Sequence, residues 1–90
     1  MNIFEEALFQ RCIKKWGADL QKVVAMEECC ELAKVISKQL RRDASREEVL
    51  AEIADVRIML DQMLVILGFD EEEENAVRRI KIKRLRGKVG

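Results

Sequence analysis

The sequence contains no histidine, and this absence removes several classes of active site. Without histidine the chain cannot build a Ser-His or Cys-His nucleophile pair, or any mechanism with a histidine general base. It also lacks the Glu-x-x-His motif with which helical bundles hold two iron ions. A site made of carboxylates alone suits Mg²⁺ or Mn²⁺ and suits iron, copper and zinc poorly. Any metal chemistry in this chain is therefore expected to use hard oxygen ligands.

Proline is also absent, and glycine occurs only at positions 17, 68, 87 and 90. Only four residues are aromatic although 49% of the chain is hydrophobic, so the core should be aliphatic. This composition predicts helices throughout, because strands would need more β-branched runs and turn residues. Ninety residues allow one domain, which we place at 1–90. A chain this short is marginal alone, and segment 49–67 is apolar on too many sides for a monomer, so we expect at least a dimer.

Cysteine is scarce, and charge of one sign does not dominate. The three cysteines, Cys12, Cys29 and Cys30, have no zinc-type spacing and are expected to be small buried fillers. The formal net charge is zero, so no global field draws the chain to nucleic acid or membrane. Because neither a signal peptide nor a membrane-length apolar run is present, we expect a cytoplasmic protein with no membrane partner.

Helix start and stop signals divide the chain into four helices joined by short connections. Capping residues open three of the helices, and glycine ends two of them. Short connections between long helices favour antiparallel neighbours, so we predict an all-α, antiparallel four-helix bundle. The signals are the pairs Asn2 with Glu5, Ser45 with Glu48 and Asp70 with Glu73, together with Gly17, Asp19, Leu40 and Gly68.

Two pairs of carboxylates lie at helical spacing within otherwise apolar segments. Glu28 and Glu31 belong to the second predicted helix, and Glu52 and Asp55 belong to the third. A step of three residues places both members of a pair on one helix face. At about 100° per residue both pairs fall on the apolar arc of their helix, toward packed surface. If the two helices are antiparallel, the pairs lie at nearly the same level, about one turn apart.

Four carboxylates in a partly dry site repel one another and need protons or a cation. A hard, oxygen-liganded ion such as Mg²⁺ fits this set, and Mg²⁺ commonly shares its ligand shell with phosphates. Hydrolysis of a phosphoanhydride is the chemistry that such a site favours. The alternative interpretation is that the four acids form ordinary ion pairs with Lys or Arg on the helix surface.

The arrangement of these segments resembles that of a known enzyme family. Segment Glu27–Leu32, followed about twenty residues later by Glu52–Val56, is similar to the signature of MazG-type all-α nucleoside triphosphate pyrophosphohydrolases. Segments Lys15–Gln21 and Lys81–Leu85 resemble parts of the small, single-domain, often phage-associated members. The resemblance spans about residues 4–86. It implies hydrolysis of the α–β bond of (d)NTPs, which gives a nucleoside monophosphate and pyrophosphate, in a protein that forms dimers or dimers of dimers.

The resemblance also implies roles for particular residues. Glu28, Glu31, Glu52 and Asp55 would be the ligands of Mg²⁺, or of Mn²⁺ as an alternative. These four residues are the candidate catalytic set. Glu27 matches the additional acid of the family motif and would orient a water or support a ligand. Contacts with the nucleotide substrate would come from the basic residues Lys34, Lys38, Lys81 and Arg84, and from Trp16 stacking on a base.

Other interpretations remain open at this point. Phosphoribosyl-ATP pyrophosphatases and dUTPase-like enzymes use a similar set of carboxylates on related helices. A helical interaction or nucleotide-binding module without turnover is a further alternative. Binding of nucleic acid would depend on the basic segment Arg78–Lys88 alone, which has no aromatic residue for stacking on bases, and we do not expect it.

Overall fold

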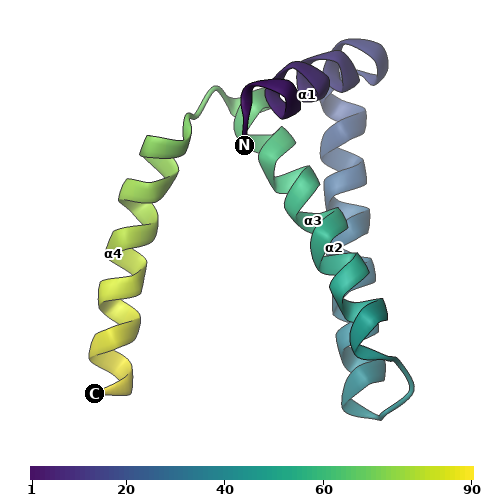
Figure 1. Ribbon diagram of the computed structural model, residues 1–90, viewed down its shortest axis with the longest axis vertical. Coiled ribbons are helices and arrows are strands. Elements are labelled where there is room, and N and C mark those ends of the chain that lie inside the picture. Colours follow the sequence, from purple (N-terminus) through teal and green to yellow (C-terminus); the bar gives the residue numbers. More distant parts are fainter.

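The computed structural model describes all 90 residues and consists of four α-helices without strands (Figure 1). The helices are α1 (Ile3–Trp16), α2 (Ala18–Leu40), α3 (Arg46–Leu67) and α4 (Glu71–Val89). This confirms the all-α prediction and the number of helices. None of the four combines the length and apolar character needed to cross a lipid bilayer.

Two of the three predicted capping pairs form both of their hydrogen bonds, and the third forms one. The Asn2 side chain accepts from the backbone N–H of Glu5 at 2.8 Å, and the Glu5 carboxylate accepts from the Asn2 N–H at the same distance. Asp70 and Glu73 form an equivalent reciprocal pair at the start of α4. Ser45 accepts from the N–H of Glu48 at the start of α3. Each cap satisfies a backbone donor that the helix leaves free, a contribution of about 1 kcal/mol.

Helices α2 and α3 form an antiparallel hairpin, and α1 lies across its end opposite the turn and contacts both (Figure 1). The small core lies where these three helices meet, and a buried hydrogen bond of 2.7 Å from Gln21 Nε2 to Gln62 Oε1 joins α2 to α3. This bond satisfies one polar group of each amide inside an otherwise apolar contact. The buried apolar residues are Phe9, Ala25, Val56 and Met59.

Helix α4 lies apart from the other three helices and forms the second limb of an open arch (Figure 1). None of its residues is buried. One chain therefore packs three of its helices together and does not by itself close a four-helix bundle. Gly68 ends α3 in the left-handed conformation, with φ of 77°, and the N–H groups of Gly68 and Phe69 donate to Val65 and Leu64 in a Schellman motif.

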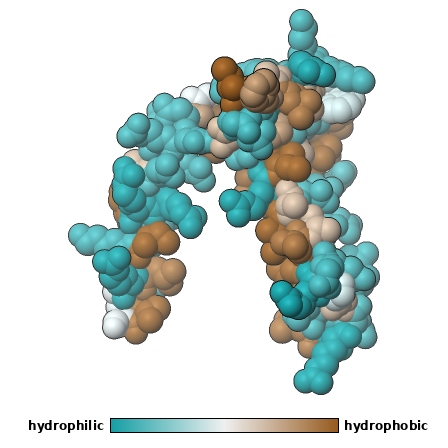
Figure 2. Space-filling model, in the orientation of Figure 1, coloured by the Kyte–Doolittle hydropathy of each residue, from teal (hydrophilic) through white to brown (hydrophobic).

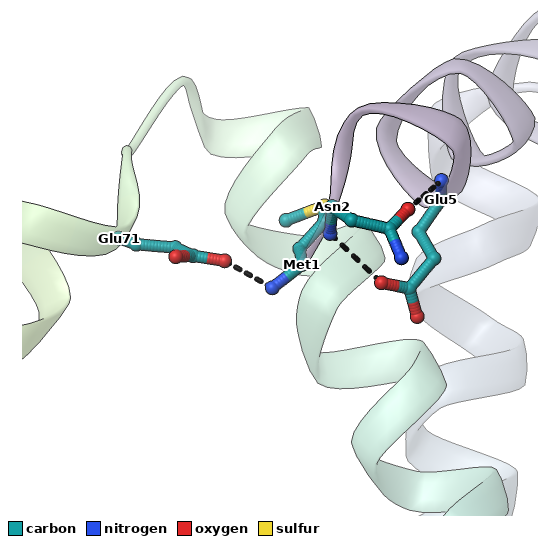
Figure 3. Close-up of polar contacts among 4 residues, drawn as sticks. All are labelled: Met1, Asn2, Glu5 and Glu71. Atoms are coloured by element: carbon teal, nitrogen blue, oxygen red, sulfur yellow. Dashed lines mark hydrogen bonds and ion pairs between the residues drawn. The ribbon is translucent and has the colours of Figure 1, made fainter.

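The N-terminus of the chain contacts the beginning of α4. The α-amino group of Met1 donates to the carboxylate of Glu71, next to the Asn2–Glu5 capping box (Figure 3). This hydrogen bond, more than the surrounding negative charge, raises the pKa of the amino group above its ordinary value. The contact links α4 to the first helix at the apex of the arch.

The expectation of buried cysteines is wrong for two of the three positions. Cys29 and Cys30 are exposed on α2, and Cys12 is half-buried. The face of α2 that meets α3 runs through Ala25 and Glu28, which leaves the next two side chains turned away from the contact.

Candidate metal centre

Three carboxylates from neighbouring helices converge on the α2–α3 hairpin. Glu28 comes from α2, whereas Glu52 and Asp55 come from consecutive turns of α3. One carboxylate oxygen from each residue lies within 4.8 Å of the other two. Oxygens this close belong to groups that can share one hard cation. The antiparallel hairpin thus brings together one member of the first predicted pair and both members of the second.

No basic side chain neutralises this cluster. Across the whole structure only two ion pairs form, between the Met1 amino group and Glu71 and between Arg41 and Asp43. Neither involves Glu28, Glu52 or Asp55. The interpretation of these acids as members of ordinary surface ion pairs therefore finds no support in the structure.

Glu52 carries the least satisfied polar atom of the molecule. Its Oε2 is buried and has no hydrogen-bond partner, although the residue as a whole is only half-buried. A buried acceptor without a partner costs about 1–3 kcal/mol, and more when it is charged. A cation at this position would supply the missing partner, so the donor set and its orphaned oxygen both fit a metal ion such as Mg²⁺.

The pKa of the Glu28 carboxyl is raised above its ordinary value of 4.5. Loss of hydration in the half-buried site is the largest cause, and the negative charges of Asp55 and Glu52 add to it. Glu31 contributes in the same direction and more weakly. The electrostatics of the cluster thus favour either a proton on Glu28 or a cation among the carboxylates.

Glu31 lies outside the group of three and is exposed. It lines a shallow hollow of about 310 Å³ beside the cluster, together with Lys34, Lys38 and Glu52. The expectation that all four acids point toward packed surface holds for Glu28 and Glu52, whereas Glu31 and Asp55 face solvent. Glu31 is one turn nearer the hairpin loop than Glu28, so α2 contributes only Glu28 to the cluster.

The hollow also contains an acid that the sequence interpretation did not include. Glu48 lines it from α3, one turn before Glu52. A spacing of four residues places Glu48 and Glu52 on one helix face, which is a signal for this position. The capping motif that begins at Ser45 gives Glu48 a second, purely structural explanation. Lys34 and Lys38, the predicted substrate contacts on α2, also line this hollow.

The remaining predicted site residues lie elsewhere. Glu27 is exposed on α2, adjacent in sequence to Glu28. Lys81 and Arg84 belong to α4, which makes no contact with the α2–α3 hairpin of its own chain. Trp16 ends α1 with 49% of its surface exposed, and the Lys15 ammonium lies 5.3 Å from the centre of its ring. The structure does not bring Lys81, Arg84 or Trp16 to the cluster.

Comparison of the chain with protein-family models, with curated proteins and with solved structures found no match in any of the three.

Proposed function

We propose that the protein is a Mg²⁺-dependent nucleotide pyrophosphohydrolase that cleaves the α–β phosphoanhydride of (d)NTPs to a nucleoside monophosphate and pyrophosphate. The observation that supports this best is the convergence of Glu28, Glu52 and Asp55 without a cationic partner, with one buried oxygen of Glu52 unsatisfied. The resemblance of segments Glu27–Leu32 and Glu52–Val56 to the MazG-type signature supplies the reaction.

In this proposal Glu28, Glu52 and Asp55 would hold the metal, and Glu31 lines the adjoining hollow. When bound, Mg²⁺ neutralises charge on the polyphosphate and lowers the pKa of a water molecule. The carboxylates of the chain repel the negatively charged phosphates of a nucleotide that carries no cation. The substrate therefore binds together with its cation.

The lysines of the hollow give the substrate phosphates a second source of positive charge. Lys34 and Lys38 lie one and two turns beyond Glu31 on α2, and both residues line the hollow together with Glu52. They would bind and orient the triphosphate. The resemblance gives Glu27, which is exposed beside Glu28 and outside both the cluster and the hollow, the role of orienting the attacking water. A carboxylate near that water would accept its proton as the bond to the leaving pyrophosphate breaks.

Pyrophosphate release from a panel of NTPs and dNTPs, measured with Mg²⁺ and with EDTA, tests the proposal. We expect release with Mg²⁺ and none with EDTA, and the panel ranks the bases and sugars, including dUTP. Metal-dependent nucleotide binding without pyrophosphate would instead support a non-catalytic binding module. Release that persists in EDTA would contradict the metal-dependent mechanism.

A further inference from the structure

Helix α4 carries apolar side chains that nothing in its own chain covers. Their positions at 82, 85 and 89 follow alternating steps of three and four residues, with Val77 and Ile80 on neighbouring rows. Such spacing on an exposed helix is typical of a seam that packs against another helix. The exposed apolar residues of α4 are Val77, Ile80, Ile82, Leu85 and Val89.

Helix α3 has a second apolar seam in addition to the face that packs on α2. Val56 and Met59 lie on the buried face of α3, in the small core. A different set of side chains follows steps of three and four along another face of α3, interrupted by Arg57. Most of this α3 seam is exposed, at 37–65%. Its members are Leu50, Ile53, Leu60, Leu64 and Leu67.

The single chain exposes too much surface for its size. Its accessible surface is 7430 Å², whereas a compact protein of 10.5 kDa exposes about 5,400 Å². Its radius of gyration is 15.5 Å, against about 12 Å for a compact domain of this length. The surplus of about 2,000 Å² exceeds the roughly 800 Å² that each partner buries in a standard interface.

The charges of α3 and α4 are complementary. Helix α3 has five acidic and two basic residues, a net charge of −3, and α4 has four acidic and seven basic residues, a net charge of +3. Four of the five acids of α3 lie in its first half, at 47, 48, 52 and 55, and the basic residues of α4 all lie between 78 and 88. An antiparallel pairing of the two helices places these oppositely charged halves side by side.

The connection between α3 and α4 keeps the two seams apart within one chain. It has only three residues, and the caps at Gly68 and Asp70 end one helix and begin the next. The contact between the Met1 amino group and Glu71 holds the first turn of α4 at the apex. Figure 2 shows apolar side chains on the sides of α3 and α4 that face each other across the open space of the arch.

We propose that two copies of the chain interlock as a two-fold dimer in which α4 of each copy occupies the open arch of the other. There α4 packs antiparallel on the α3 seam of the other copy, so one dimer contains two identical α3–α4 contacts. This arrangement covers both seams and pairs the complementary charges. It does not depend on the proposed hydrolysis.

Sedimentation velocity on the full chain tests the dimer and the role of α4. We expect the native chain to sediment as a dimer and Leu85→Glu to sediment as a monomer with unchanged helix content by circular dichroism. Lys83→Glu is the matched control, because Lys83 lies on the face of α4 opposite Leu85. This variant changes the net charge more than Leu85→Glu does, and it should nevertheless remain dimeric. A native chain that sediments as a monomer, for example because α4 closes on its own hairpin, would overturn the proposal. A Leu85→Glu variant that remains dimeric would also overturn it.

A mixing experiment distinguishes exchange of α4 from pairing of α3 with α3 or of α4 with α4. Leu50→Glu and Leu85→Lys each damage both contacts of a homodimer, and each should be monomeric alone. Mixed together, they can form a heterodimer with one intact α3–α4 contact, and we expect a dimer to reappear. If the mixture stays monomeric although both variants are folded, exchange of α4 is excluded.

Discussion

At the scale of single residues, Glu52 has the most unusual environment in the molecule. Its Oε2 is buried without a partner, and its neighbours Glu28 and Asp55 are also acidic. In the absence of metal such a position destabilises the fold, because no basic side chain offsets the charge. A position that lowers stability is expected where function requires the residue, and this is the basis of two predictions.

Replacement of Glu52 by glutamine should abolish metal binding while preserving the fold. The amide removes a negative ligand from the cluster, so we expect pyrophosphate release to fall by more than about 100-fold, beyond the loss typical of residues that only support ligands. Without Mg²⁺ the melting temperature should stay equal or rise, because repulsion with Glu28 is relieved. Glu47→Gln, an exposed acid of α3 outside the cluster and the hollow, is the control. Normal turnover in Glu52→Gln would contradict the assignment of this metal ligand.

The raised pKa of Glu28 predicts how stability depends on pH without metal. The folded state holds this proton more tightly than the unfolded state, in which the pKa is near 4.5. Stability should therefore fall as pH rises from about 4.5 through the higher folded pKa. Thermal melts in EDTA across this range would show the decrease. Asp61, whose pKa burial also raises, contributes in the same direction, so Glu28→Gln should reduce the decrease without removing it. An identical pH profile in Glu28→Gln would contradict this origin.

At the scale of helices, the pairing of α2 with α3 positions the cluster, and the Gln21–Gln62 hydrogen bond lies within this contact. Both side chains are buried, with 5% and 4% of their surfaces exposed. A buried polar pair of this kind favours one register over others, because any shift would leave both amides unpaired. The alignment of Glu28 with Glu52 and Asp55 depends on that register.

A double-mutant cycle should reveal the coupling between these two glutamines. Gln62→Leu leaves the Gln21 amide buried without its acceptor, which should lower the free energy of unfolding by about 1–3 kcal/mol. The double variant Gln21→Leu with Gln62→Leu should recover most of this loss. Urea unfolding of the four proteins measures the cycle. Additive effects of the two single changes would show that the hydrogen bond does not couple the helices.

At the scale of the whole molecule, metal binding should stabilise the folded protein. Only the folded hairpin brings the three carboxylates together, so Mg²⁺ binds the native state selectively. At a metal concentration one hundred times the dissociation constant, this linkage gives about 2.7 kcal/mol. For a chain of this size the melting temperature should rise by roughly 10–20 °C, as differential scanning calorimetry would measure. The rise should vanish in Glu52→Gln, and an unchanged melt of the native chain would count against a preformed site.

The helices themselves follow from local sequence. The capping pairs Asn2–Glu5 and Asp70–Glu73 and the glycine at 68 all act within a few residues of each other, and the structure forms each as predicted. The same holds for the i, i+3 pair Glu52–Asp55, because helical geometry alone places both on one face. These features depend on nearest neighbours along the chain, which a sequence displays directly.

The tertiary structure decided which of these local features meet. Glu28 joins the cluster and Glu31 does not, because the level at which α2 and α3 cross depends on side-chain packing between residues far apart in sequence. The exposure of Cys29 and Cys30 and the separation of α4 have the same origin. Contacts between distant segments depend on shape and on which surfaces are covered, and periodicity within one helix holds no information about either.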